Sequence, residues 1–180
     1  LGIEIYNKKT VGSILGRTLS PITGFNDATG NYGSIGNKGV EITLNTRNIR
    51  TDNFSWTTNL NFSKNNNEIL DLDGSLDLIP YENHGVLQIG QPADAIWTYE
   101  KLGIYQLDEV AEAAVYNRFP GEYKFKDQNN DGLLDNDDKV VIGQLSPDWI
   151  AGMTNTFSYK NLDISIQAYT RQGSVGHSEF

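Results

Sequence analysis

The sequence contains no cysteine among its 180 residues. Disulfide bonds, thiolate nucleophiles and zinc–thiolate centres are therefore excluded, although this absence fits a bacterial surface as well as a cytoplasm. Basic residues are scarce too, since 14 Lys and Arg stand against 23 Asp and Glu, giving a net charge of -9. Because nucleic-acid binding requires a surplus of basic side chains on one face, nucleic acid is set aside as a partner.

Long hydrophobic runs are also missing. No stretch of about 18 apolar residues occurs, which excludes a transmembrane helix. The chain does not open with a charged segment followed by an apolar one, so no signal peptide is predicted and the chain is interpreted as a fragment. A transmembrane β-barrel passes both tests, because its strands alternate apolar and polar residues and leave the mean hydropathy of -0.45 uninformative.

The residues that are present suit strands and turns, namely 18 glycines with abundant Asn, Thr, Ser and Tyr. Four segments alternate apolar and polar residues with the period of a two-faced strand. They are residues 39–47, 54–63, 149–159 and 162–170. We predict an all-β fold in which they pair as two antiparallel hairpins, the second closed by a tight turn at Lys160 and Asn161. Residues 1–9 are predicted to end another strand.

Two kinds of β protein fit this alternation. A soluble sandwich has strands with one polar and one apolar face. A transmembrane barrel has them too, and each predicted strand has about the 9 to 11 residues that a tilted strand needs to cross the hydrocarbon layer. The polar faces are rich in Asn, Thr and Ser, as a wet lumen would be, and aromatic residues stand at strand ends, as an interfacial girdle would. The strand pattern alone leaves both readings open.

Composition divides the chain into three parts. Residues 1–66 and 149–180 carry the barrel strands, whereas residues 67–148 form a more acidic and less regular insertion. Within the insertion, Asp108 is predicted to cap a short helix over residues 109–116, with Pro120 after its end. Outer-membrane barrels have short periplasmic turns and long extracellular loops, so the insertion is predicted to be extracellular.

The sharpest local motif is DQNNDGLLDNDD, residues 127–138. A calcium loop of the EF-hand type supplies oxygens from its positions 1, 3, 5, 7, 9 and 12 around a glycine at position 6, which here is Gly132. The predicted ligands are Asp127, Asn129, Asp131, the Leu133 carbonyl, Asp135 and Asp138. Position 12 departs from the pattern, because Asp138 replaces the usual bidentate glutamate.

An acidic surface turn without metal is the alternative for residues 127–138, since Asp, Asn and Gly gather in turns for local reasons. Calcium is favoured because the carboxylates repel one another unless a cation offsets them. With every ligand position taken by the protein, no open position remains to activate water. The predicted role of Ca²⁺ is therefore structural, in a long loop exposed to extracellular calcium.

No motif indicates an enzyme. His84 and His177 are isolated, and no serine stands in a nucleophile-elbow motif. The aromatic residues of the insertion could form a sugar-stacking surface, although such residues more often form a small core. They are Trp97, Tyr99, Tyr105, Tyr116 and Tyr123.

Together, the motifs resemble the C-terminal part of the SusC/RagA family of TonB-linked outer-membrane proteins from Bacteroidetes-type bacteria. Four segments carry this resemblance: NYGSIGNKGVEITL (31–44), FSWTTNLNFSKNNNEIL (54–70), GQPADAIWTYEKLGIYQ (90–106) and residues 120–166. The resemblance implies a segment of a transmembrane barrel that imports glycans or peptides across the outer membrane. It implies a SusD-like surface lipoprotein as partner, and TonB acting through a plug absent from this chain.

The resemblance also implies that the 127–138 loop is an extracellular calcium site, but it fixes no substrate-contacting residue. The alternative function is a secreted, calcium-dependent carbohydrate-binding or adhesion module, which would share the strands, the loop and the aromatics. Such a module would be soluble without detergent, whereas barrel strands have apolar faces that contact lipid and would require detergent.

Overall fold

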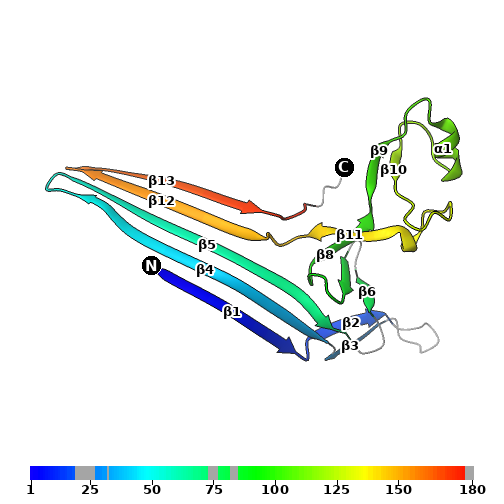
Figure 1. The fold of residues 1–180 in the computed structure, drawn as a ribbon, viewed down its shortest axis with the longest axis horizontal. Coiled ribbons are helices and arrows are strands. Elements are labelled where there is room, and N and C mark those ends of the chain that lie inside the picture. The colour runs from blue at the N-terminus through cyan, green and yellow to red at the C-terminus, as the bar shows by residue number, and fades with distance from the viewer. Residues whose placement is uncertain (19–26, 32, 73–76, 82–84, 177–180) are drawn as a thin grey trace.

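A computed structural model describes residues 1–18, 27–31, 33–72, 77–81 and 85–176. His84 and His177 lie outside the described residues. Antiparallel strands dominate, and the largest sheet has five of them in the order β1-β4-β5-β12-β13 (Figure 1). Their bounds are Gly2–Val11, Ser34–Arg50, Phe54–Asp71, Trp149–Tyr159 and Leu162–Gln172. The all-β prediction is confirmed, and no helix in the described part of the chain is long and apolar enough to cross a membrane.

Both predicted hairpins form. β4 and β5 are paired from Ser34↔Asp71 to Arg50↔Ser55, so these strands are longer than the sequence predicted. β12 and β13 are paired along their whole length, and Lys160 adopts a positive φ of 52° in the tight turn. Residues 1–9 belong to a strand, as predicted, and this strand, β1, pairs with β4.

Small sheets occupy the segment between β5 and β12, at the end of the long sheet away from the hairpin turns (Figure 1). A four-stranded sheet has the order β11-β8-β7-β6, and β10 pairs with β9. The bounds from β6 to β11 are Leu78–Tyr81, Gly85–Gln88, Ala95–Tyr99, Lys101–Ile104, Tyr123–Phe125 and Lys139–Gln144. A further pair, β2 (Ile14–Thr18) and β3 (Asp27–Asn31), lies between β1 and β4 in the chain. β5 extends beyond residue 67, where the sequence placed the start of the insertion.

The predicted helix is present as α1, Val110–Val115, but its predicted cap is wrong. Glu109, not Asp108, is the N-cap residue, and it makes no side-chain capping bond. The Glu109 carboxylate instead accepts a hydrogen bond from the Gln106 backbone N–H and forms an ion pair with Lys124. The N-cap position therefore lies one residue later than the sequence predicted.

One face of the five-stranded sheet is apolar, because residues paired across antiparallel strands stand on the same face. Its central rows are Ile3, Ile42, Phe62 and Ala151, and next to them Leu44, Leu60, Met153 and Ala168. We call this side the apolar face. Between Lys64 and the hairpin turns, none of the described residues on it is charged. Many remain exposed, among them Ile164 at 49% and Ile166 at 58%.

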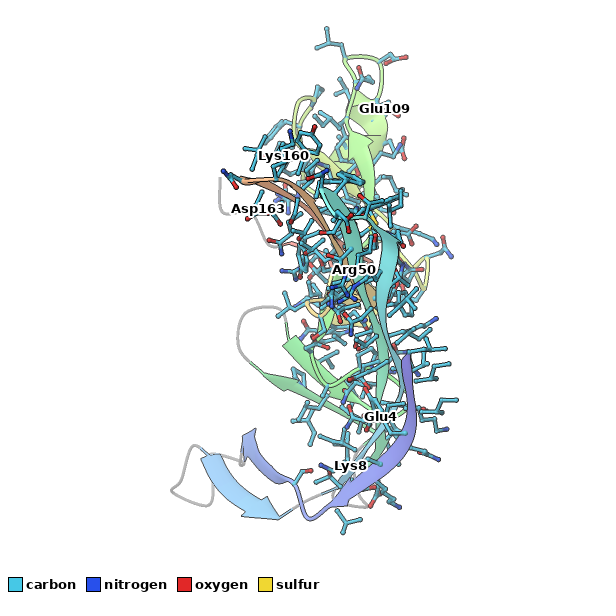
Figure 2. All side chains as sticks on the ribbon, turned by 90° about the vertical axis from the view of Figure 1, so that its left-hand side faces the viewer. Glu4, Lys8, Arg50, Glu109, Lys160 and Asp163 are labelled. Atoms are coloured by element: carbon cyan, nitrogen blue, oxygen red, sulfur yellow. The ribbon has the colours of Figure 1, made fainter. Side chains whose placement is uncertain are left out.

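Aromatic pairs stand toward the two ends of the apolar face. The rings of Trp56 and Phe157 stack with centroids 5.6 Å apart near the turns, and those of Phe62 and Trp149 stack at 6.0 Å at the other end. Charged residues gather beyond the first pair, since Arg50, Lys160 and Asp163 lie at the turn end that faces the viewer in Figure 2. This order of charge, aromatic belt and apolar rows is typical of a membrane-spanning strand.

Polar atoms on the apolar face bind one another. Asn155 Oδ1 accepts hydrogen bonds from Thr58 Oγ1 at 2.6 Å and from Trp56 Nε1 at 3.0 Å. Asn48 extends this cluster, because its Nδ2 donates to the same threonine hydroxyl at 2.6 Å. Since unpaired polar groups are costly in an apolar medium, the cluster reduces the penalty of placing them on this face.

The other side of the sheet, the polar face, carries hydrogen-bonded asparagines. Asn61 Nδ2 donates to Asn59 Oδ1 at 2.8 Å, and Asn59 in turn donates to Asn45 across the β4–β5 pair. Nearer the insertion, Asn67 Nδ2 donates to Asn37 Oδ1 at 2.9 Å. The two faces of one sheet are therefore suited to different surroundings, one apolar and one wet.

A small core joins the insertion to the long sheet. Ile69 and Leu72, at the end of β5, pack with Ile79 and Leu87 of the four-stranded sheet, and all four are at most 8% exposed. Ala93 packs against the same cluster. This contact anchors the insertion at the end of β5.

Candidate functional site

The 127–138 loop, which we call the acidic loop, runs from β10 to β11 and ends in a short 3₁₀ turn, η2 (Asn136–Asp138). Three of its side chains accept a hydrogen bond from the backbone N–H two residues further on. These bonds are Asn129 Oδ1 from Asp131 at 3.0 Å, Asp131 Oδ1 from Leu133 at 2.8 Å and Asp135 Oδ1 from Asp137 at 2.9 Å. These are Asx turns, and three of them within seven residues coil the chain locally.

Asp127 organises the first half of the acidic loop. Its two carboxylate oxygens accept hydrogen bonds from the backbone N–H groups of Asn130 at 2.6 Å and Gly132 at 2.8 Å. Gly132 has a φ of 83°, which a residue without a Cβ adopts readily. Burial acts to raise the pKa of Asp127, but these two bonds and the Tyr116 hydroxyl outweigh it and hold the pKa below its ordinary value. The charge on Asp127 therefore stabilises the folded loop at neutral pH, and this stabilisation is lost as the pH falls through the lowered pKa.

Asp138 closes the acidic loop. Its side chain is fully buried, and its two oxygens accept hydrogen bonds from the backbone N–H groups of Gln128 at 2.8 Å and Asp135 at 2.9 Å. One carboxylate thus ties the start of the loop to its end. Aspartate, although shorter than the usual glutamate, reaches both segments because it stands in the 3₁₀ turn.

The six predicted ligand residues fall into two groups. Asp127 and Asp138 are buried, whereas the others are exposed, namely Asn129, Asp131, Leu133 and Asp135. Within the described residues, no three Asp, Glu, His or Cys side chains are placed so as to hold a metal ion. The donor set is nevertheless all oxygen, as calcium requires, and a carboxylate has more lone pairs than the loop N–H groups use. The calcium site therefore stays a prediction.

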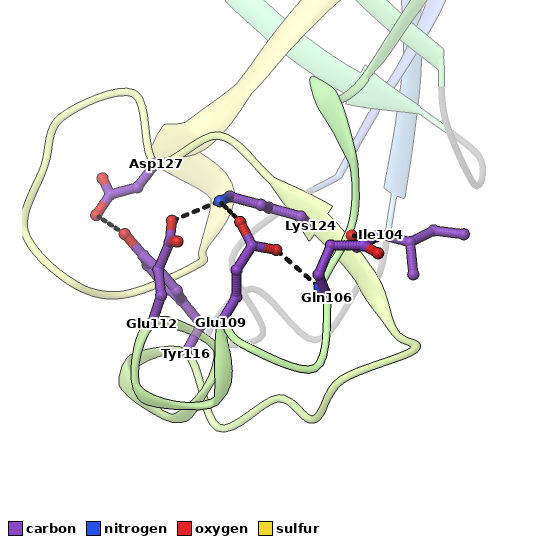
Figure 3. A network of polar contacts seen from close by, with 7 residues as sticks. All are labelled: Ile104, Gln106, Glu109, Glu112, Tyr116, Lys124 and Asp127. Carbon is purple, nitrogen blue, oxygen red and sulfur yellow. Dashed lines mark hydrogen bonds and ion pairs between the residues drawn. The ribbon is translucent and has the colours of Figure 1, made fainter.

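A polar network connects α1 to the acidic loop (Figure 3). Lys124 of β10 forms ion pairs with Glu112 at 2.7 Å and Glu109 at 3.1 Å. These two carboxylates raise the pKa of Lys124. One helical turn later, the Tyr116 hydroxyl donates to Asp127 Oδ2 at 3.2 Å. The helix is thus held against the strand that leads into the loop.

The five aromatic residues that the sequence singled out do not form one surface. Tyr105 is 2% exposed and belongs to the interior of the insertion, while Tyr116 is engaged with the acidic loop. Tyr99 and Tyr123 both contact the ring of Phe125, with centroid distances of 5.6 and 6.3 Å. Of the two alternatives that the sequence left open, burial in a small core applies to Tyr105, and a single stacking surface of all five residues is not formed.

Trp97 lines a groove of about 620 Å³ on the four-stranded sheet. Gln88, Gln91, Asn136 and Asp137 line the same groove. Sequence reasoning missed these four residues, because they are spread over 50 positions and belong to no motif. Only the pairing of β7, β8 and β11 brings them together.

The geometry defines a class of protein: a long antiparallel sheet with one apolar and one wet face, bearing a loop-rich insertion at one end, as in a wall segment of an outer-membrane barrel. No family model matches the sequence. Curated relatives do match it, including TonB-dependent receptor P26 of Formosa agariphila, 40% identical over 96% of this chain and 18% of its own length. TonB-dependent receptor SusC of Bacteroides thetaiotaomicron is 31% identical over 91% of this chain and 17% of its own length.

Solved structures show the same fold. The RagAB peptide importer in its closed-closed state aligns with a TM-score of 0.72 at 22% identity, over 96% of this chain and 19% of that chain. A second structure of the RagAB peptide transporter gives 0.69 at 19% identity, over 92% and 18%. The chain therefore corresponds to a segment of the SusC/RagA family of TonB-linked outer-membrane proteins, which confirms the resemblance. It spans about a fifth of the length of these relatives.

Proposed function

We propose that this chain forms part of a TonB-dependent outer-membrane importer, in which the five-stranded sheet is a portion of the barrel wall. The observation that carries the proposal is the apolar face, whose uncharged rows stay exposed between two aromatic pairs. In water such a surface would be an aggregation liability, whereas lipid tails cover it without cost. The polar face then lines the lumen, and the insertion lies on the extracellular side, opposite the tight hairpin turns.

The proposed cargo is a glycan or another oligomeric nutrient. The relatives named SusC and RagAB support a transport role, and RagAB is named a peptide importer. In the proposed mechanism, a SusD-like surface lipoprotein helps to capture the substrate outside. TonB then acts through a plug that lies beyond this chain. The residues of this chain contribute no catalytic step, since their role is to shape the lumen wall and the outer mouth.

A membrane-fractionation experiment tests the location. We expect the full-length protein in the outer-membrane fraction, resistant to carbonate extraction and soluble only in detergent, because the apolar face would otherwise meet water. Release into the medium as a monodisperse soluble species would contradict the importer and favour a secreted, calcium-dependent carbohydrate-binding module.

A deletion strain tests transport. We expect loss of the gene to abolish growth on at least one oligosaccharide as sole carbon source, with growth on the corresponding monosaccharide unchanged. Re-expression of the wild-type protein is the control and should restore growth. Unchanged growth on all oligosaccharides, with lost use of oligopeptides, would instead assign a peptide cargo.

We further propose that the acidic loop binds one structural calcium ion through the six predicted oxygen donors. The support is the chain of Asx turns, which already coils the loop, and the closure of its two ends by Asp138. Bound calcium would offset the charge repulsion among the loop carboxylates, and no residue there is assigned a catalytic role.

Replacing Asp127 and Asp131 together with alanine tests the calcium proposal. We expect the double variant to lose calcium binding, measured by calorimetry on the full-length protein in detergent, and to expose residues 127–138 to proteolysis. The barrel should remain folded, since neither residue belongs to the five-stranded sheet. Asp163→Ala, at the opposite end of the sheet, is the matched control. Unchanged calcium binding in the double variant would contradict the site.

A further inference from the structure

The groove that contains Trp97 lies on the free face of the four-stranded sheet. The other face of this sheet is closed, because Ile79 and Leu87 are buried against the end of β5. Strand alternation places Leu78 and Gln88, which are paired, on the side away from that core. Both line the groove. The groove is therefore a surface of the insertion that the described core does not cover.

The groove has apolar walls. Leu78 and Pro80 of β6 form one side, and Trp97 of β8 forms the other. Val86 and Ala95, which are paired on the same face, are 0% and 1% exposed, so this part of the face is covered and does not line the groove. An apolar cleft of this kind, with a few convergent polar groups, is the usual form of a small-ligand site.

Four polar side chains at the groove have no hydrogen-bond partner among the described residues. They are Gln88, Gln91, Asn136 and Asp137. Three are amides, each with two donors and an acceptor, and one is a carboxylate with two acceptor oxygens. Planar groups of this kind match adjacent hydroxyls on a sugar ring, whose C–H face can lie on an aromatic ring.

The charges favour a neutral ligand. The groove contains one cation, Lys139, and one exposed anion, Asp137. The ammonium of Lys139 lies 5.0 Å from the centroid of the Trp97 ring and 5.5 Å from that of Tyr99. Because the lining has one cation and one anion, the groove has no net charge, which favours a neutral ligand.

The middle of the groove lies on a sheet face, which limits how a peptide could bind there. Extended peptides bind by adding a strand to a free sheet edge, where backbone N–H and C=O groups are available. In the groove, Trp97 and Gln88 come from β8 and β7, which are interior strands of the order β11-β8-β7-β6. Their backbone groups take part in the sheet, so over these two strands only side chains remain to bind a ligand. The groove also reaches the edge strands, β6 through Leu78 and Pro80 and β11 through residues 139–141, so a peptide is included in the test as the competing ligand.

We propose that this groove is a binding subsite for a neutral oligosaccharide, with Trp97 as the stacking platform and Gln91 and Asp137 as hydroxyl partners. The inference rests on the proposed import function and deepens it by assigning residues that contact the glycan. It places substrate recognition on the insertion, beside the turn that ends the acidic loop.

Calorimetry on the full-length protein in detergent tests this inference. The probes are malto-, cello-, laminari-, xylo- and mannohexaose, with an uncharged hexapeptide for comparison. For the hexaose that binds, we expect Trp97→Ala to raise Kd about tenfold or more, as truncation of a central aromatic anchor does. Gln91→Ala and Asp137→Ala should each raise it several-fold. Tyr123→Ala removes an exposed aromatic of the same insertion outside the groove and should leave Kd unchanged.

The variants separate binding from folding. Trp97 Nε1 donates to the Lys139 carbonyl at 3.0 Å, so its removal can disturb the sheet. The side chains of Gln91 and Asp137 make no such bond to any described residue, so we expect their loss to leave the fold intact. Hexaose binding that none of the three variants weakens would overturn the subsite. Peptide binding with the same variant sensitivity would overturn its carbohydrate class.

The growth assay distinguishes this failure from failure of the proposed function. If the deletion strain loses growth on a glycan while the three groove variants grow and bind like wild type, import stands and the subsite is wrong. If deletion leaves growth on every glycan unchanged and the protein binds no hexaose, glycan import is itself wrong, and the subsite with it.

Discussion

Replacing Leu60 with arginine is expected to deplete the folded protein from the outer membrane. Leu60 stands near the middle of the apolar face, opposite Leu44 and Met153. A cationic side chain near the centre of the lipid-facing surface destabilises a barrel by about 2 to 4 kcal/mol. This is a large part of the stability of a typical folded domain. The variant should therefore accumulate as degraded or periplasmic material.

Asn61→Arg is the matched control for this substitution. Asn61 is the next residue of β5, but it stands on the polar face, opposite Thr43 and Gly152. The same arginine there meets water, so the amount of folded protein should stay near that of wild type. The amount of folded protein is measured for both variants by heat-modifiability on gels and by yield in the outer-membrane fraction. Equal yields of the two variants would show that the apolar face does not meet lipid.

Replacing Asp138 with alanine is expected to loosen the acidic loop even without metal. The buried carboxylate accepts two backbone N–H groups, from Gln128 and Asp135, which alanine leaves without their acceptor. Each unpaired buried donor costs about 1 to 3 kcal/mol. Amide hydrogen exchange of residues 127–138, measured on the full-length protein in a calcium chelator, should accelerate clearly.

Asn129→Ala provides the comparison, because Asn129 is also a predicted ligand but is exposed, and its side-chain oxygen accepts one backbone bond, from Asp131. In the chelator, its loop should exchange at close to the wild-type rate. In calcium, both variants should lose protection, since each lacks one predicted ligand. If the two variants exchange equally in the chelator, Asp138 has no closing role of its own.

The two hairpins could be predicted from the sequence because the alternation within each strand shows which side chains share a face. Residues 54–63 alternate, and most partner residues in β4 and β12 agree with that assignment, the exceptions being Ile150 opposite Ser63 and Asn155 opposite Thr58. The extra length of β4 and β5 was missed, because their ends carry Asn, Lys and Glu, which show no contrast between faces. A β-strand can continue through such residues wherever a neighbour offers backbone partners.

The candidate site was predictable only where it is local. Asx turns depend on residues two apart, so the spacing of the acidic residues was sufficient to predict a coiled loop at residues 127–138. The roles of Lys124 and Tyr116, which connect that loop to α1, depend on contacts across the insertion. The predicted cap at Asp108 was wrong because the N-cap position falls one residue later, at Glu109.

The sequence by itself determined the β class, the two faces, the family resemblance and the acidic loop, because these features repeat over short distances or follow a fixed order along the chain. Only the tertiary structure decided which aromatic residues are available to a ligand. Tyr105 and Trp97 look alike in the sequence, yet one is buried and the other lines a groove with Gln91 and Asp137. Burial depends on which strands become neighbours, and that is set by packing of the whole sheet rather than by any single segment.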